Sequence, residues 1–100
     1  MKEDVTFTRF HDAMKSTYNG NGFTYEGLRA LYEYLIELEE STAEELELDP
    51  IAFYSTYTQY ENINEFWNDY DKETFPDKGS IFDHTAYIEV DQDSFIIEQF

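Results

Sequence analysis

Residues 23–40, FTYEGLRALYEYLIELEE, decide the fold because they carry the strongest helical pattern in the chain. Thr24 suits the N-cap of a helix, and Phe23 before it can pack on Leu28 four positions into the helix. Apolar residues then recur every three or four positions, the spacing that places side chains on one helical face. These residues are Leu28, Leu31, Tyr32, Leu35 and Leu38. The pattern predicts a helix from about Tyr25 to Glu40.

A second helical stripe precedes this segment. It consists of Phe7, Phe10, Met14 and Tyr18, and Thr6 suits its N-cap. Residues 19–22, NGNG, follow, and glycine suits the left-handed position past a helix end. An Asn-Gly pair also favours a hairpin turn. The helical spacing on both sides favours two helices joined by a turn.

Two segments after the long helix allow more than one structure. Residues 41–44, STAE, resemble a capping box and allow a short extra turn, whereas the alternation of Leu46 and Leu48 equally allows a strand. Residues 49–57, DPIAFYSTY, begin with Asp-Pro, a good helix start, but are rich in strand formers. Proline is tolerated at the first residue of a strand. We therefore predict a strand over residues 49–57.

The C-terminal half predicts a short helix, a loop and a hairpin. Residues 62–70, NINEFWNDY, combine a cap with apolar residues at helical spacing. Residues 72–83 contain one proline and one glycine and predict a loop. Residues 85–90 alternate apolar and polar side chains, residues 91–93 turn the chain, and residues 94–100 return as a second strand.

Together these elements predict a single acidic α+β domain over residues 1–100, in the order ααβαββ. We expect a small antiparallel sheet that contains the C-terminal hairpin, with helices packed on one face of the sheet. The length of the chain fits one domain with its own core.

The charge balance is the outlier in the composition. The chain has 23 Asp and Glu against 6 Lys and Arg, a formal net charge of -17, but its 19% aromatic residues indicate a folded domain. Anionic lipids and phosphates repel such a surface, so we expect neither membrane association nor direct nucleic-acid binding. The negative field instead steers the protein toward basic surfaces. The absence of Cys, and of an apolar run in the N-terminal MKEDVTFTRF, fits a cytosolic protein.

The acids concentrate in residues 30–71, which contain twelve carboxylates and no Lys or Arg. Glu33 and Glu37 form a like-charge pair at i,i+4, and Glu37 and Glu40 form another at i,i+3. Each such pair costs about a few tenths of a kcal/mol in a helix. A sequence that repeatedly accepts this cost indicates a function for the charge. The candidate partner-binding residues are Glu33, Glu37, Glu40, Glu44, Glu45, Glu47, Asp49, Asp69, Asp71 and Tyr34.

The sequence does not indicate an enzyme or a metal site. His11 and His84 lie on different predicted elements, and there is no nucleophile, phosphate-binding or zinc motif. Residues 69–73 begin like a calcium loop, but Thr74 replaces the glycine of its sharp turn, and Ser80 replaces its bidentate glutamate. We therefore expect a binding protein that is not an enzyme and has no metal or other cofactor.

Carboxylates at regular intervals present charge as a nucleic-acid backbone does, and each can accept a charge-assisted hydrogen bond from Lys or Arg. We therefore expect an inhibitor that occupies the basic groove of a nucleic-acid-binding protein. Two alternatives stay open: a solvated face without a partner, and an interaction module that uses an exposed edge of the hairpin or an aromatic patch. The tyrosines of that patch are Tyr34, Tyr54, Tyr57 and Tyr60. Both a monomer and a homodimer are compatible with the sequence.

Three stretches also carry a resemblance: FTYEGLRALYEYLIELEES, LELDPIAFYSTYTQYENINEFWNDYD and SFIIEQF. Through them the chain resembles a family of small acidic proteins of phages and prophages. In size and charge it is similar to phage-encoded DNA mimics, which include anti-CRISPR, anti-restriction and DNA-glycosylase-inhibitor proteins. The resemblance implies a bacterial cytoplasm and a counter-defence role, with a target such as a CRISPR effector nuclease or a restriction enzyme.

Overall fold

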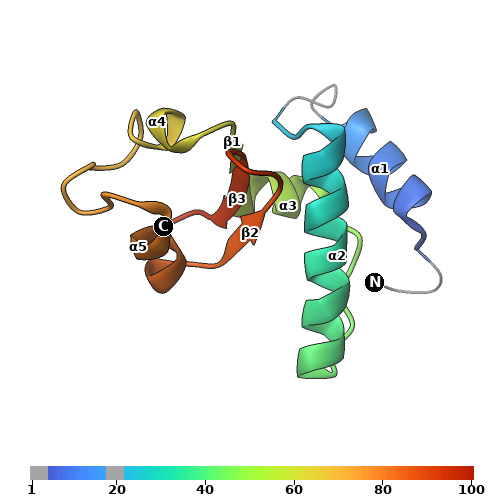
Figure 1. The fold of residues 1–100 in the computed structure, drawn as a ribbon. Helices are drawn as coiled ribbons and strands as arrows, with labels where there is room; N and C mark the ends of the chain where they lie inside the picture. The colour runs from blue at the N-terminus through green and yellow to red at the C-terminus, as the bar shows by residue number, and fades with distance from the viewer. Residues whose placement is uncertain (1–4, 18–21) are drawn as a thin grey trace.

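The computed structural model describes residues 5–17 and 22–100, in which a small sheet stands between two groups of helices (Figure 1). In chain order the helices and strands are α1 (Phe7–Ser16), α2 (Tyr25–Thr42), α3 (Pro50–Thr56), β1 (Tyr57–Tyr60), α4 (Ile63–Phe66), α5 (Lys78–His84), β2 (Tyr87–Glu89) and β3 (Phe95–Glu98).

The sheet has the order β1-β3-β2, and both neighbouring pairs are antiparallel. In the central strand, Ile97 pairs with Thr58 of β1 on one side and with Tyr87 of β2 on the other. The carboxylate of Asp91 closes the β2–β3 turn by accepting the N–H of Ser94 at 2.7 Å. The predicted α+β class, the antiparallel sheet and the C-terminal hairpin are confirmed.

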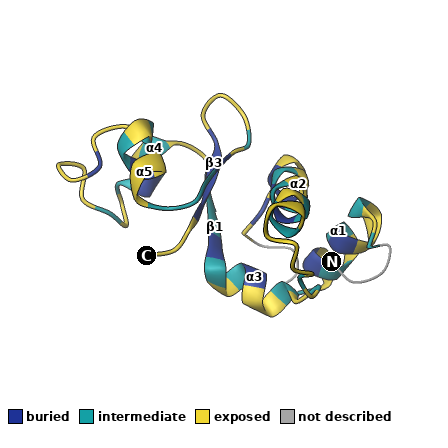
Figure 2. Cartoon of the chain, turned by 90° about the horizontal axis from the view of Figure 1, so that it is seen from below, coloured by how far each residue is buried: buried dark blue, intermediate teal, exposed yellow. Residues whose placement is uncertain are grey.

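Each face of the sheet packs on its own core, because successive side chains of a strand point to opposite faces. Ile88 of β2 and Ile96 of β3 join the core that α1, α2 and α3 build. Phe95 and Ile97 of β3 join a second core, which contains side chains of α4 and α5. Figure 2 shows the sheet between the two groups. The prediction of helices on one face is therefore wrong, since a strand that is apolar on both sides is buried on both.

The two N-terminal helices form as predicted. Thr6 and Thr24 cap them by accepting the backbone N–H of Arg9 at 3.2 Å and of Gly27 at 3.0 Å. The buried residues of these helices are Phe10 and Met14 in α1 and Gly27, Leu28, Leu31 and Leu35 in α2. Tyr18 and residues 19–21 of the predicted turn lie outside the described residues.

The helix α2 continues past its predicted end at Glu40 as far as Thr42. Ser41 therefore lies inside the helix and does not cap a new turn. Ala43 ends the helix in the left-handed conformation, with a φ of 58°. Residues 44–49 have no regular structure, so neither the extra turn nor the strand that the sequence allowed is present. The alternating Leu46 and Leu48 instead pack against the first core from an irregular connector.

The strand predicted over residues 49–57 is wrong for most of its length. Pro50–Thr56 form the helix α3, and β1 begins only at Tyr57. Asp49 caps α3 by accepting the N–H of Ala52 at 3.2 Å, and Pro50 occupies the first turn, where it needs no N–H partner. The Asp-Pro start therefore outweighs the strand propensity of the residues behind it.

The C-terminal half contains a helix that the sequence analysis placed in a loop. Asp77 and Ser80 form a capping box at the start of α5, and Ile81 is its buried residue. A single buried position has no periodicity, which is why the pattern over residues 72–83 predicted a loop. The helix α4 is also shorter than the pattern over residues 62–70 suggested. The observed order is αααβααββ instead of ααβαββ.

Gln59 of β1 ties the start of α2 to the hairpin. Its Oε1 accepts the N–H of Thr24 at 2.9 Å, and its Nε2 donates to Thr24 Oγ1 at 3.0 Å and to Ser94 Oγ at 2.9 Å. Ser94 is buried and donates to the carbonyl oxygen of Tyr60 at 3.0 Å. Gly27 leaves room for the Gln59 amide, because a Cβ there would collide with it. A polar contact therefore helps to position α2 over the sheet.

We expect Gly27→Ala to destabilise the protein, although alanine in a helix interior normally stabilises it by about 1 kcal/mol relative to glycine. The new Cβ must displace the Gln59 amide, and each hydrogen bond lost costs about 0.5–1.5 kcal/mol. In a Gln59→Ala background the collision is absent, so the same substitution becomes stabilising. Urea unfolding across this double-mutant cycle measures the coupling, and equal effects of Gly27→Ala in both backgrounds would contradict it.

Candidate functional site

Three of the candidate carboxylates share the outer side of α2. Glu33, Glu37 and Glu40 are exposed and lie opposite the buried leucines of the same helix, given a rotation of about 100° per residue. Glu26, seven residues before Glu33, is exposed on the same side. We call Glu26, Glu33, Glu37 and Glu40 the acidic face of α2.

Arg29 lies at the edge of the acidic face. Its Nε is 3.3 Å from Oε1 of Glu33, and its guanidinium lies 4.8 Å from the centre of the Phe7 ring. Because both charged side chains are more than half exposed, this ion pair contributes only about 0.5 kcal/mol or less. Within the described residues, no Lys or Arg forms an ion pair with Glu37 or Glu40. Among the described residues, the acidic face is therefore without a cationic partner from Glu37 onward.

Sequence reasoning missed Glu26 and Arg29 as parts of this face. Both signals were available, because Glu26 and Glu33 are seven residues apart and Arg29 and Glu33 are four apart, spacings that share a helix side. Both residues lie just before residues 30–71, the segment without Lys or Arg that contains all the predicted site residues.

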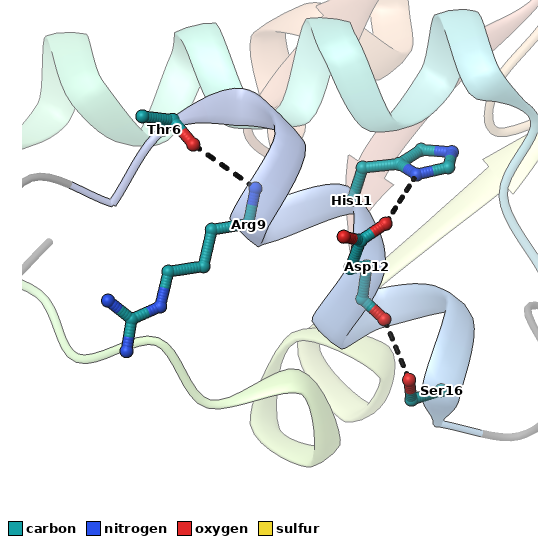
Figure 3. Close-up of polar contacts among 5 residues, drawn as sticks. All are labelled: Thr6, Arg9, His11, Asp12 and Ser16. Atoms are coloured by element: carbon teal, nitrogen blue, oxygen red, sulfur yellow. Dashed lines mark hydrogen bonds and ion pairs between the residues drawn. The ribbon is translucent and has the colours of Figure 1, made fainter.

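A further cation, Arg9, points away from the acidic face. Figure 3 shows the Arg9 side chain leaving α1 on the side away from α2, while its backbone N–H is bonded to Thr6. On the same helix, Nδ1 of His11 lies 3.7 Å from Oδ1 of Asp12, and Ser16 Oγ donates to the carbonyl oxygen of Asp12 at 2.9 Å. These contacts are local to α1 and balance none of the charge on α2.

Two cationic side chains of the C-terminal half make their contacts within that half. Nζ of Lys72 lies 4.5 Å from the centre of the Trp67 ring. Nζ of Lys78 donates to the carbonyl oxygen of Gln92 at 2.7 Å. In the sequence, Lys72 and Lys78 lie outside the acidic residues 30–71. In the structure, the contacts of both side chains are also in the C-terminal half and away from α2.

Adjoining hollows follow the acidic face, with volumes of about 280, 360 and 310 Å³. The first lies between α2 and β2, the second lies over the acidic face, and the third lies past the end of α2. The acids that line the first hollow are Glu33, Glu37 and Glu89. The second is lined by Glu33, Glu37 and Glu40, and the third by Glu39, Glu40, Glu44 and Glu45. Small-molecule sites usually begin at about 300 Å³ and enclose their ligand. These open hollows suit single side chains of a partner better.

The predicted residues after α2 divide into two groups. Glu44 and Glu45 are exposed and continue the acidic face through the third hollow. Glu47 and Asp49 belong to the connector, which returns along α2 on the side of Glu39, whose carboxylate accepts the N–H of Leu46 at 2.7 Å. Asp49 is occupied as the cap of α3. These two acids therefore do not extend the acidic face.

Asp69 and Asp71 lie in the other half of the molecule, across the sheet from α2. Asp69 accepts the hydroxyl of Tyr60 at 2.9 Å, and burial, together with this hydrogen bond, raises the pKa of Tyr60. Asp71 accepts the hydroxyl of Thr74 at 2.9 Å and the backbone N–H of Glu73 at 3.3 Å. The structure therefore does not bring these two acids to the acidic face, and both have local structural roles.

Tyr34 borders the first hollow beside Glu37 but is partly buried, with its ring centre 6.1 Å from that of Tyr57. Burial, followed by the charge of Glu98, raises the pKa of Tyr34. Burial, followed by the effects of Tyr34 and Glu98, raises the pKa of Tyr57 to about 12. Tyr57 and Tyr60 are buried core residues. The four tyrosines named above therefore do not form an exposed aromatic patch.

Other functional chemistry is not visible in residues 5–17 and 22–100. No three His, Asp or Glu residues in these ranges gather closely enough to hold a metal ion. The described helices are too short or too polar for any of them to cross a membrane.

Comparison of the chain with protein-family models, with curated proteins and with solved structures found no match. Function is therefore inferred from the geometry and charge of the acidic face.

We expect Glu37→Lys to stabilise the free protein at low ionic strength. The variant replaces two like-charge pairs by Glu–Lys pairs, each worth about 0.2–0.5 kcal/mol, and salt should reduce the gain. Glu73→Lys, at an exposed acid in the other half, is the matched control for net charge. Urea unfolding at low and high salt measures both. If Glu37→Lys is no more stable than the control, repulsion along α2 is negligible.

We expect the free energy of unfolding to fall between pH 10 and about pH 12. The folded state keeps the Tyr57 proton up to about pH 12, whereas the unfolded chain loses it near pH 10. This stabilisation is therefore complete below pH 10 and lost as the pH rises through about 12. Tyr57→Phe should make the fall shallower. Urea unfolding across this pH range measures both proteins, and an equally steep fall in the variant would contradict the effect of burial on the pKa of Tyr57.

Proposed function

We propose that the protein is a non-enzymatic inhibitor that places the acidic face of α2 in the nucleic-acid-binding groove of a basic protein. The observation that carries the proposal is the run of Glu37 and Glu40 on one side of a long helix, continued by Glu44 and Glu45, in which Glu37 and Glu40 form no ion pair with a Lys or Arg of residues 5–17 and 22–100. Each carboxylate is available to accept charge-assisted hydrogen bonds from Lys or Arg side chains that otherwise hold phosphates.

The spacing of the charges fits this role. Along the helix axis, Glu33, Glu37 and Glu40 follow each other at about 6 Å and about 4.5 Å. One strand of DNA carries a phosphate about every 3.4 Å along its axis. Between Glu33 and Glu40 the carboxylates are thus sparser than the phosphates of a nucleic-acid strand by less than a factor of two. Its charge density is of the right order for a groove whose cations are spaced for phosphates.

The rigidity of the presentation also supports the proposal. The buried leucines and the Gln59 contact fix α2, so its carboxylates need little ordering when a partner binds. A disordered acidic tail would lose far more conformational entropy on binding. A folded mimic can therefore compete with nucleic acid using fewer charges.

The class of target follows from the resemblance to small acidic phage and prophage proteins. Within the proposal, the protein acts in the bacterial cytoplasm as a phage or mobile-element product, and its target is a defence enzyme such as a CRISPR effector nuclease or a restriction enzyme. Association should be fast and should weaken steeply with salt, because the field of the acidic face steers the encounter.

The test begins with capture of the target from a bacterial lysate and continues with the purified target and its own DNA or RNA substrate. Glu37→Lys/Glu40→Lys is compared with the control Glu73→Lys/Asp83→Lys, which changes the net charge equally at exposed positions of the other half. We expect the first variant to lose inhibition by at least about tenfold, a loss of about 1.4 kcal/mol, and the control to keep it. Inhibition by the wild type should fall between about 50 and 200 mM salt.

Two results would overturn the proposal. One is a target that still binds its nucleic acid when saturated with the inhibitor, since a groove cannot hold both. The other is an equal loss of inhibition in both variants, which would mean that total charge, and not the acidic face, drives the binding.

A further inference from the structure

The strand β2 is an unpaired edge of the sheet. Val90 N donates to the carbonyl oxygen of Ser94 at 3.0 Å, and Glu98 N donates to that of Ala86 at 3.1 Å. Because hydrogen-bonded pairs alternate along an antiparallel ladder, the N–H and C=O groups of Tyr87 and Glu89 point away from β3. Within the described residues, none of these four backbone groups has a hydrogen-bond partner.

The two sides of this edge differ in chemistry. On the side of Ile88, the hollow between α2 and β2 is lined by Glu33 and Glu37 (Figure 1 shows β2 running beside α2). On the opposite side lie Tyr87 and Phe82 of α5, with ring centres 6.3 Å apart. Phe82 is 65% exposed. An added strand would therefore lie between an acidic side, formed by Glu33 and Glu37, and a side that carries the rings of Tyr87 and Phe82 with the carboxylate of Glu89 at its end.

We propose that β2 accepts an extended segment of a partner protein in which Lys or Arg alternates with apolar residues. Alternation follows from the pleat, since side chains of an added strand point in turn to the two faces. The side chain opposite Ile88 points to Glu33 and Glu37, whereas its two neighbours point to the other face, one beside Tyr87 and Phe82 and the other beside Glu89. The outward backbone groups supply the hydrogen bonds of strand addition, and the two sides supply the selectivity.

This inference goes beyond the proposed function, because strand addition requires no resemblance to a nucleic acid. It shares Glu33 and Glu37 with the acidic face but depends on backbone groups that groove binding does not use. Substitutions at position 89 therefore test it separately from Glu37→Lys/Glu40→Lys.

The direct test uses the full chain and two synthetic peptides of equal composition, one alternating lysine and valine and one with all lysines before all valines. We expect the alternating peptide to bind about tenfold more tightly, because only alternation places the lysines on the side of Glu33 and Glu37 and the valines on the side of Tyr87 and Phe82. Its binding should also slow hydrogen exchange at the amides of Tyr87 and Glu89, measured by NMR. Equal affinities, or unchanged exchange at these amides, would overturn the inference.

A matched pair of variants provides the second test. Glu89→Pro removes one outward N–H without removing a bond to β3, and proline is tolerated on an edge strand. Glu89→Gln removes the same charge but keeps the N–H. The alternating peptide should bind the proline variant about tenfold more weakly than the glutamine variant. Should the proline variant fail to fold, amide exchange in the wild type decides alone.

Concentration-dependent dimers of the wild type that protect the amides of Tyr87 and Glu89 from exchange would instead identify a second copy of this chain as the occupant. That result would overturn the proposed partner.

Discussion

The burial of Leu28, Leu31 and Leu35 fixes the rotation of α2, and this rotation decides which carboxylates face solvent. Each fully buried leucine contributes about 1.5–3 kcal/mol, whereas each like-charge pair on the opposite side of the helix costs about 0.2–0.5 kcal/mol. Apolar packing therefore outweighs the repulsion several times over. The helix can hold a row of neighbouring acids at a small cost in stability, and the row stays in one place because the leucines do.

The central strand β3 sets the second constraint. Its side chains at Phe95, Ile96 and Ile97 are all fully buried, so both faces of the sheet must be covered. Helices α1 to α3 cover one face, and α4 and α5 cover the other. The predicted site residues are divided by this arrangement, because Asp69 and Asp71 follow α4 on the far side and Glu33, Glu37 and Glu40 lie on α2. Acids that are close in the sequence are thus divided in the structure: Glu33, Glu37 and Glu40 share one side of α2, whereas Asp69 and Asp71 accept local hydrogen bonds.

The sequence predicted what periodicity and caps determine locally: α1, α2 and the C-terminal hairpin. It failed where local signals competed, and where a short element carried no pattern. At residues 49–57, a cap and a proline formed a helix against the strand propensity of the residues that follow, and at α5 one buried residue, Ile81, left no pattern to detect. On the site, helical spacing was enough to group Glu33, Glu37 and Glu40. The hollow beside β2 was beyond prediction, because it depends on how the hairpin packs against α2, a tertiary contact that no spacing encodes.

The most direct test of the central claim is the structure of the protein bound to the target that it captures. The acidic face predicts that Glu37, Glu40 and Glu44 lie within hydrogen-bonding distance of the Lys and Arg side chains that hold phosphates when the target binds its own nucleic acid. A complex in which α4 and α5 form the interface, or in which the nucleic-acid groove of the target remains open, would contradict the claim.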